Sequence, residues 1–298
     1  MENRVYDMLI VGGGPGGYTA ALYAARAGMS VLVLEKFSIG GQMAESPQID
    51  NYPGIVDGID GFSLGQQMKT HAEKFGARTL LTQVKKLNLT GEIKSAETDD
   101  GIFEAKTVVI ATGATPKKLG VPGEQEYLGR GVHYCAACDG MFYRNKTVAV
   151  VGGGNTAAAD ALLLSRVAKK VLLIHRRDSL RASKVYHSAL AEAENVEFYW
   201  NSALTEIRAG EIVINGTEMI PCDGVFVAIG REPETDLVRD NLPLDDKGYI
   251  LAGESTETGI GGVYAVGDVR TKGLRQIITA AADGANAVSS AEEYLAEK

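Results

Sequence analysis

Two cysteines stand two residues apart in Cys135-Ala136-Ala137-Cys138, and Asp139 follows them directly. This spacing permits a readily reduced disulfide, in which one thiolate attacks an acceptor and the other resolves the mixed disulfide. The neighbouring Asp139 can take and return the protons of the dithiol as a general acid and base. We therefore predict Cys135, Cys138 and Asp139 as catalytic residues, with an exposed aspartate in a turn as the alternative interpretation of Asp139.

A zinc site is the other use of paired cysteines, but a structural zinc ion needs four ligands. The remaining candidates are Cys222 and four scattered histidines, of which only His133 is close to the pair in sequence: His71, His133, His175 and His187. We therefore expect no metal site. Three cysteines cannot form the disulfide framework of a secreted protein either. Cys222 lies beside a predicted strand over residues 225–229 and is expected to be a structural thiol.

An internal repeat supplies the elements that position these residues. Residues 8–36 and 148–176 align without a gap at a constant offset of 140. Each copy has the pattern of a strand, a glycine-rich turn, an alanine-rich helix over 16–27 or 156–168, and a second strand. The pattern is that of the opening βαβ unit of a dinucleotide-binding fold, present twice.

The glycines of such a turn have separate tasks. Gly12 makes the tight turn, Gly14 lets the backbone approach a pyrophosphate, and Gly17 lets the helix pack closely on the strand. The matching residues of the second copy are Gly152, Gly154 and Ala157. In both copies the pyrophosphate is expected on the free N–H groups at the start of the helix.

The two copies differ at the end of their second strand. The first has Glu35, whose carboxylate accepts hydrogen bonds from ribose hydroxyls and repels a 2′-phosphate. The second has His175, Arg176 and Arg177, with Arg181 one turn later. Such a cationic cluster suits the 2′-phosphate of NADP. A solvated basic loop is the alternative interpretation of this segment.

Domain boundaries follow from the strands that close each unit. Residues 107–113 and 224–230 read as apolar strands ending in glycine, and Pro116 and Pro233 lie just beyond them. A further strand near 262–268 and a helix over 276–295 complete the first domain. We therefore predict an α/β protein with two Rossmann-like, three-layer dinucleotide-binding domains, the second inserted into the first. The expected boundaries are 1–115, 116–238 and 239–298.

Composition narrows the possible partners and location. The 298 residues are enough for two domains, and the net charge of −8 disfavours a nucleic-acid or anionic-membrane partner. The chain has no uninterrupted apolar stretch of membrane-spanning length. Its first residues, Met1 to Asp7, lack the basic head and apolar middle of a signal peptide. A cytoplasmic protein is expected.

Together these residues resemble the low-molecular-weight thioredoxin reductases over almost the whole chain. The landmarks of that family stand here at 12–17 (GGGPGG), 40–42 (GGQ), 51–54 (NYPG), 111–114 (ATGA), 135–140 (CAACDG), 152–157 (GGGNTA), 175–178 (HRRD), 267–269 (GDV) and 275–276 (RQ). The resemblance implies the FAD/NAD(P)-linked reductase type of fold, FAD in the first site and NADPH in the second. It also implies a homodimer and electron flow from NADPH through FAD and the cysteine pair to thioredoxin.

The resemblance also assigns residues to the two cofactors. It places FAD on Gly12, Gly14, Pro15, Gly17, Glu35, Gly41, Gln42, Asn51, Ala111, Thr112, Gly113, Asp268, Arg275 and Gln276. It places NADPH on Gly152, Gly154, Asn155, Thr156, His175, Arg176, Arg177 and Arg181. By the same carry-over Asp268 binds the ribityl chain, Gln42 and Asn51 line the flavin site, and Gln276 meets the pyrimidine edge.

Two departures from the family pattern stand out. Ala137 replaces the usual threonine between the cysteines, and Ala159 replaces the first of two acids, leaving Asp160. The second change removes one carboxylate near the expected nicotinamide site, which puts the rate of hydride transfer or the domain contacts in doubt.

Other functions of such a scaffold remain open from the sequence. A thiol oxidase would pass electrons from its dithiol through FAD to oxygen and would not need the arginine cluster. A ferredoxin-NADP reductase would lack the cysteine pair, and a nucleotide sensor would need neither flavin nor dithiol. Because dithiol and nicotinamide would share the inserted domain, we also expect that domain to rotate so that each reaches the flavin in turn.

Overall fold

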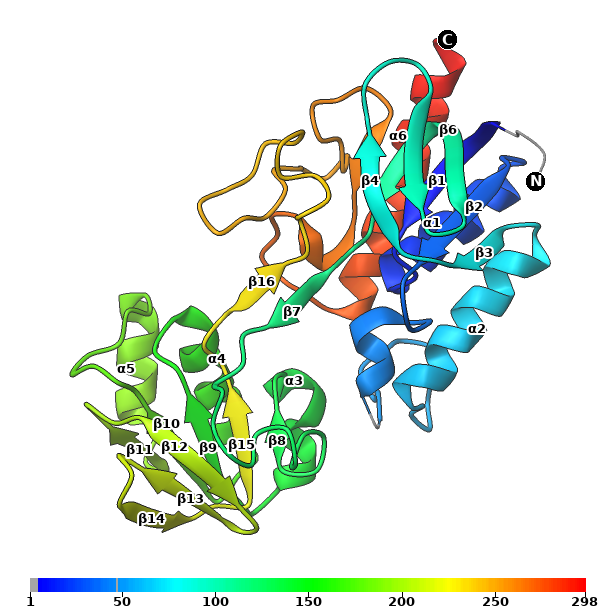
Figure 1. Cartoon of the computed structure of the whole chain (residues 1–298). Coiled ribbons are helices and arrows are strands. Elements are labelled where there is room, and N and C mark those ends of the chain that lie inside the picture. The colour runs from blue at the N-terminus through cyan, green and yellow to red at the C-terminus, as the bar shows by residue number, and fades with distance from the viewer. Residues whose placement is uncertain (1–4, 47) are drawn as a thin grey trace. The chain divides into compact units, whose positions relative to one another are not determined.

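The computed structural model describes residues 5–46 and 48–298, which divide into two compact units (Figure 1). The first unit comprises the residues up to Thr115 together with Glu232–Lys298, and the second comprises Pro116–Arg231. The predicted fold class, two α/β units with parallel sheets, is confirmed. Residues 1–4, which entered the expectation of a cytoplasmic location, lie outside the described part of the chain.

The return to the first unit follows residue 231 and not residue 238 as the sequence suggested. Hydrogen bonds explain the earlier boundary, because the segment after the crossing is already attached to the first unit. The N–H of Glu234 donates to Gly113 O at 3.0 Å, and the hydroxyl of Thr112 donates to Glu234 O at 2.6 Å.

A mixed sheet forms the centre of the first unit. Its strands lie in the order β3-β2-β1-β6-β5-β4, with β17 also paired to β6. The β1, β2, β3, β6 and β17 strands are parallel, and β4 and β5 are antiparallel additions. The elements are β1 (Val5–Val11), α1 (Pro15–Arg26), β2 (Val31–Glu35), η1 (Gly41–Glu45), α2 (Gly61–Lys74), β3 (Arg78–Leu81), β4 (Val84–Asn88), β5 (Lys94–Thr98), β6 (Gly101–Ile110), β17 (Val263–Ala265), η3 (Gly267–Val269) and α6 (Ile277–Ala296).

Both faces of this sheet are covered, which explains why its central strands are continuous apolar runs. Along β1, Met8 and Ile10 pack in the cluster that contains residues of α1, α2 and α6. Leu9 and Val11 point to the opposite face, toward β4, β5 and the segment around 238–252. The sheet therefore has helices on one face, and its parallel strands end together at one edge, where ligands bind in such folds.

The second unit repeats this plan in a smaller form. Its parallel sheet has the order β11-β10-β9-β15-β8, and an antiparallel sheet of β12, β13 and β14 packs on it. The elements are β8 (Val132–His133), α3 (Ala136–Asp139), η2 (Gly140–Tyr143), β9 (Thr147–Val151), α4 (Asn155–Ser165), β10 (Lys170–Ile174), α5 (Lys184–Glu192), β11 (Val196–Tyr199), β12 (Leu204–Arg208), β13 (Glu211–Ile214), β14 (Glu218–Pro221) and β15 (Gly224–Val227). The sequence repeat thus corresponds to β1-α1-β2 and β9-α4-β10.

Two short strands carry the chain between the units. The strands β7 (Ala114–Pro116) and β16 (Arg231–Pro233) pair with each other and run side by side in Figure 1. They contain Pro116 and Pro233, the two prolines that follow the closing strand of each unit in the sequence.

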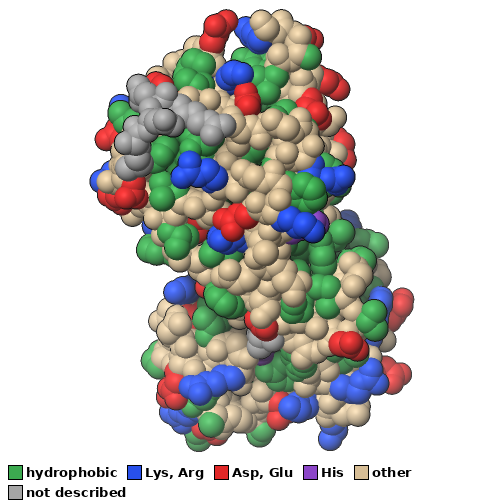
Figure 2. All heavy atoms as spheres, turned by 90° about the vertical axis from the view of Figure 1, so that its right-hand side faces the viewer, with side chains coloured by type: hydrophobic (Ala, Val, Ile, Leu, Met, Phe, Trp, Pro, Cys, Tyr) green, Lys and Arg blue, Asp and Glu red, His purple; other side chains and the backbone are tan. Residues whose placement is uncertain are grey.

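On the face that Figure 2 shows, acidic and basic side chains are interspersed. In the described residues no helix combines the length and the apolar character that crossing a bilayer requires.

Candidate active site

The first glycine turn is open where a phosphate is expected and crowded elsewhere. Gly12 has a φ of +108°, and a side chain there would collide with the carbonyl of Ala111. A side chain on Gly17 would collide with the carbonyl of Gly12, whereas one on Gly14 would meet nothing within 4 Å. The turn therefore leaves free space beside Gly14 at the start of α1, which fits a pyrophosphate held by backbone N–H groups.

Glu35 is buried at the end of β2 and bonds to the turn itself. Its Oε2 accepts from the N–H of Gly13 at 2.6 Å, and Oε1 accepts from Phe37 at 2.9 Å and Ser38 at 3.3 Å. Two carboxylate oxygens offer about four acceptor sites, so capacity for ribose hydroxyls remains. Glu35 therefore stabilises the turn as well as offering the acceptor that the sequence predicted.

The segment with Gly41 and Gln42 lies against the same turn. The N–H of Gly40 donates to Gly13 O at 2.8 Å, and a side chain on Gly41 would stand 3.4 Å from the Cα of Gly14. Gln42 follows at the start of η1. The structure thus brings these predicted flavin residues to the glycine turn.

Further predicted residues meet at the start of α6. The amide of Asn51 donates to Oε1 of Gln276 at 3.0 Å, across a long sequence separation. Gln276 caps α6, accepting a hydrogen bond from the Thr279 backbone while the Thr279 hydroxyl accepts from the Gln276 N–H. Arg275 lies over the ring of Tyr249 at 4.1 Å. Asn51, Arg275 and Gln276 are therefore positioned around one helix N-terminus.

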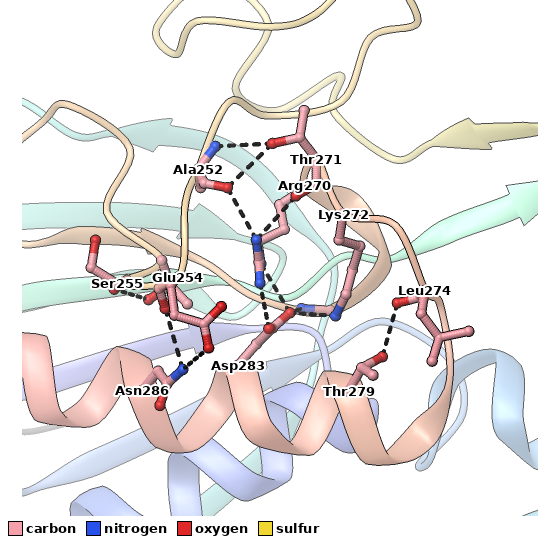
Figure 3. A network of polar contacts seen from close by, with 12 residues as sticks. Ala252, Glu254, Ser255, Arg270, Thr271, Lys272, Leu274, Thr279, Asp283 and Asn286 are labelled. Atoms are coloured by element: carbon pink, nitrogen blue, oxygen red, sulfur yellow. Dashed lines mark hydrogen bonds and ion pairs between the residues drawn. The ribbon is translucent and has the colours of Figure 1, made fainter.

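The turn that carries Asp268 is held by a buried ionic cluster, shown in Figure 3. Asp283 on α6 accepts hydrogen bonds from Arg270 Nη2 at 2.6 Å, from Lys272 Nζ at 2.7 Å and from the N–H of Gly267 at 2.8 Å. Burial raises the pKa of Asp283, but the hydrogen bonds and charges of Arg270 and Lys272 outweigh this and lower it below its ordinary value. The cluster fixes the turn from Gly267 to Arg270. No local sequence pattern indicates it beyond one aspartate in a helix that is otherwise mostly apolar.

Ala111, Thr112 and Gly113 follow the end of β6. Ala111 lies directly under the glycine turn, since its carbonyl is the group that excludes a side chain from Gly12. The Thr112 hydroxyl, by contrast, bonds to Glu234. The backbone of this predicted segment thus contacts the turn, while the Thr112 side chain supports the crossing.

The second glycine turn matches the first in shape. A side chain on Gly152 would collide with the Ala228 carbonyl, as the one on Gly12 would with Ala111, and Gly154 is open in the same way as Gly14. Asn155 begins α4, and its Oδ1 accepts from the N–H of Ser183 at 2.8 Å. This bond holds the loop after β10 against the turn.

His175 lies over the middle glycine of this turn, because a side chain on Gly153 would overlap the imidazole ring. Burial and the charges of Arg181, Arg177 and Arg176 lower the pKa of His175. In the described part of the chain its buried Nε2 has no hydrogen-bond partner. Burial and the nearby charges therefore favour the neutral ring, and the three arginines beside it are exposed.

Cys135 and Cys138 are joined in a disulfide at the short helix α3, and both are partly exposed. Asp139 is buried, so its interpretation as an exposed turn residue is wrong. Its Oδ2 lies 3.1 Å from Nδ1 of His133, and Nε2 of His133 lies 2.7 Å from the hydroxyl of Tyr143. The sequence analysis missed this network, because no local pattern connects β8 with residues 139 and 143.

Cys222 behaves as expected for a structural thiol. It is buried, its Sγ donates to Gly224 O at 3.2 Å, and burial raises its pKa to about 12. The described residues contain no group of side chains arranged to hold a metal ion.

Comparison with known proteins identifies the family. The model of the pyridine nucleotide-disulphide oxidoreductase family matches residues 6–284. A thioredoxin reductase of Peptoclostridium acidaminophilum is 42 % identical over 99 % of this chain and 98 % of the relative. The crystal structure of the Streptococcus pyogenes thioredoxin reductase superimposes with a TM-score of 0.93 at 43 % identity, covering 100 % of both chains. A thioredoxin reductase from Giardia duodenalis superimposes with a TM-score of 0.91 at 31 % identity, covering 98 % of this chain and 99 % of the other.

The chain therefore belongs to the pyridine nucleotide-disulphide oxidoreductase family. Within that family its relatives are of the thioredoxin reductase type, as the sequence resemblance predicted. Enzymes of this type are flavoproteins that use FAD and NADPH, so the predicted cofactors are confirmed. The close pair of Cys135 and Cys138 is consistent with the redox-active dithiol of such an enzyme.

Proposed function

We propose that this protein is an NADPH-dependent thioredoxin-disulfide reductase. It passes electrons from NADPH through FAD and the Cys135/Cys138 dithiol to the disulfide of thioredoxin or of a thioredoxin-like protein. The observation that carries the proposal is the disulfide itself, which lies in the same unit as a glycine turn flanked by exposed arginines.

The residues of the first unit would hold FAD. The open space at Gly14 and the start of α1 suit its pyrophosphate, and Glu35 suits its adenosine ribose. The N-terminus of α6 beside Gln276 suits the edge of the ring at which negative charge develops. The remaining members of this proposed site are Gly12, Pro15, Gly17, Gly41, Gln42, Asn51, Ala111, Thr112, Gly113, Asp268 and Arg275.

The second unit would hold NADPH in a similar cradle. Gly152, Gly154, Asn155 and Thr156 form the phosphate turn and the start of α4. Exposed arginines near His175 would bind the 2′-phosphate: Arg176, Arg177 and Arg181. When bound, FAD supplies the conversion of a hydride from the nicotinamide into an electron pair that can reduce a disulfide.

The cysteines then perform thiol–disulfide exchange with the acceptor. One enzyme thiolate attacks the acceptor disulfide and forms a mixed disulfide, and the second enzyme thiol displaces the acceptor dithiol. Asp139 takes and returns the protons of these steps. By resemblance Cys135 exchanges with thioredoxin and Cys138 faces the flavin.

From the resemblance to the low-molecular-weight thioredoxin reductases we further propose that the protein is a homodimer and that it is cytoplasmic. We also propose that the inserted unit rotates about the two paired strands β7 and β16. Light scattering of the purified protein tests the dimer. A monomeric mass at micromolar concentration would overturn it.

NADPH consumption with a panel of thioredoxins and small disulfides tests the function. Yellow protein with a flavin spectrum and thioredoxin-dependent NADPH oxidation is the expected result. Colourless protein that still binds NADPH would indicate a nucleotide sensor, and oxygen consumption by the reduced dithiol without NADPH turnover would indicate a thiol oxidase.

A further inference from the structure

A buried histidine, His133, contacts Asp139, the residue that directly follows the dithiol in the sequence. The imidazole of His133, on β8, lies 3.1 Å from Asp139 through Nδ1 and 2.7 Å from the Tyr143 hydroxyl through Nε2. Its flat face stacks on Phe226 with ring centroids 5.3 Å apart. His133 and Asp139 are only 5 % and 8 % exposed, so water cannot replace these contacts readily.

The hydrogen bonds of this network permit two protonation states of His133. Burial and the nearby charge of Asp139 raise the pKa of Tyr143 to about 12, so its hydroxyl keeps its proton. In the charged ring Nδ1–H donates to Asp139 and Nε2–H donates to the oxygen of that hydroxyl. When the Nδ1 proton passes to Asp139, Nδ1 accepts from the protonated carboxyl and Nε2–H still donates to the Tyr143 oxygen. His133 can therefore gain or lose a proton without leaving a buried polar atom of its own unpaired.

The surroundings of the network are mostly apolar. At Tyr143, Lys146 lies 5.5 Å over the phenol ring, and the charges of Asp139, Cys222 and Asp223 act on the hydroxyl. Across the described residues, Oδ1 of Asp139 is buried with no hydrogen-bond partner. One carboxylate oxygen is thus fixed by His133, and the other is free to carry a proton.

We propose that His133 is a positioning residue of the dithiol centre that holds Asp139 through Nδ1 and shares one exchangeable proton with it. The inference rests on the proposed disulfide reduction and adds a second proton carrier to it. Asp139 is the group that meets the dithiol, and His133 sets its orientation and restores its proton.

The proton balance of thiol–disulfide exchange shows where the shared proton is needed. Reduced enzyme and oxidised acceptor give oxidised enzyme and reduced acceptor, so two electrons and two protons move from one dithiol to the other. Each attack requires a thiol to lose a proton, and each departing alkyl thiolate must gain one. The Asp139–His133 pair accepts the proton of the attacking thiol and returns it to the departing thiolate, so no external oxidant or proton is consumed.

The test compares acceptors that differ in their need for that proton. The probes are oxidised thioredoxin and dithiodiethanol, whose alkyl thiolates need protonation on leaving, and dithiobis-nitrobenzoate, whose aromatic thiolate leaves without it. The rate of reaction of the reduced holoenzyme with each is measured from about pH 6 to pH 9. His133→Asn keeps an N–H for Asp139 but cannot carry a proton.

We expect His133→Asn to react with both alkyl disulfides about tenfold more slowly near pH 8, with a smaller loss near pH 6. With the aromatic disulfide the loss should be smaller than with the alkyl disulfides, because that reaction needs the proton acceptor but not the proton donor. The exposed His71 provides the matched control, His71→Asn, which should follow the wild type. Equal losses with alkyl and aromatic acceptors, or a pH profile parallel to the wild type, would overturn the proton-sharing role.

If His133→Asn does not fold, Tyr143→Phe replaces it, because it removes only the hydroxyl that serves both states of the ring. It should also lower the alkyl rate selectively at high pH, and an unselective loss counts against the proposal. Wild-type protein that reduces dithiodiethanol but not thioredoxin would refute the proposed acceptor, while the dithiodiethanol profile still decides the role of His133.

Discussion

The two glycine turns have nearly the same backbone but opposite electrostatics at the end of the following strand. In the first unit the buried carboxylate of Glu35 accepts three backbone hydrogen bonds, one of them from the turn. In the second unit His175, whose pKa is lowered by burial and by the nearby arginines, lies over the turn, and exposed arginines such as Arg176 and Arg181 follow it. In the proposed function, the turn would hold the pyrophosphate of either cofactor, and the residues at the end of the following strand would select the nucleotide.

The two units also differ in which of them carries the redox-active residues. Both units provide the cradle, but only the second carries the disulfide, in α3 between β8 and β9. The first unit instead fixes its turn at Gly267 with the buried Asp283 cluster. The disulfide is thus confined to the second unit, and the buried ionic cluster to the first.

The largest effect on turnover is expected from removing one cysteine of the disulfide in the second unit. Cys138→Ser should lower thioredoxin reduction by at least about 10³-fold, because the exchange needs two sulfurs. Reduction of bound flavin by NADPH should remain. Stopped-flow absorbance of the flavin and steady-state thioredoxin turnover measure the two steps separately.

Cys222→Ser is the matched control for that variant, since this third cysteine is a buried thiol hydrogen-bonded to Gly224. It should retain turnover. Full thioredoxin reduction by Cys138→Ser would mean that the pair does not relay electrons.

The next largest effect should come from the arginines that follow β10 in the second unit. Arg176→Ala with Arg181→Ala removes charge-assisted contacts to the 2′-phosphate, at a cost of about 1.5–3 kcal/mol, roughly 10- to 100-fold. The kcat/KM for NADPH should fall by that factor, and that for NADH should change little. Arg208→Ala, another exposed arginine of the same unit, serves as control; equal losses for NADPH and NADH would contradict the assignment.

A smaller effect, on FAD affinity, is expected from Glu35 at the end of β2. Glu35→Ala leaves the N–H of Gly13 without its acceptor and removes the ribose contact, so FAD affinity should fall about tenfold. Equilibrium titration of apoprotein with FAD measures this. The exposed Glu92 gives the control variant Glu92→Ala, and unchanged affinity in Glu35→Ala would remove Glu35 from the site.

The sequence predicted those features whose residues lie close together in the chain, above all the features that the repeat shows twice. The repeat revealed both turns and both strand ends, and the proline crossings at 116 and 233 marked the inserted unit. A repeat is readable because each copy specifies its own strand, turn and helix within about 30 residues.

Contacts between distant side chains were not predictable in this way. The His133 network and the Asp283 cluster join elements whose local patterns are ordinary, and only packing determines which way each side chain points. The role of the middle glycine in each turn, Gly13 and Gly153, was not predictable for a related reason. A side chain on Gly153 would overlap the His175 ring, and one on Gly13 would stand 3.1 Å from Oε2 of Glu35 and from the Tyr18 ring, contacts that no spacing encodes.

The smallest effect concerns a position inside the two matching helices. By the constant offset, Asp160 of α4 corresponds to Ala20 of α1, which is fully buried. Burial raises the pKa of Asp160 from 3.8 to about 6, although the charge of Arg231 lowers it in part. The second unit therefore carries an acid where the first carries a methyl group.

The sign of the resulting pH dependence follows from proton binding. A carboxyl whose pKa is raised on folding binds its proton more tightly in the native state, so its favourable contribution is complete below about pH 4 and lost as the pH rises to about 6. Asp160→Ala, which copies the first unit, should therefore be more stable than the wild type at pH 7.5 by about 1–2 kcal/mol, a figure reduced for partial exposure. Near pH 4.5 the gain should largely vanish.

Urea unfolding at both pH values measures the difference in stability between Asp160→Ala and the wild type, with the exposed Asp240→Asn as control. An equal gain at both pH values would mean that Asp160 ionises without cost, and the two helices would then differ only in packing.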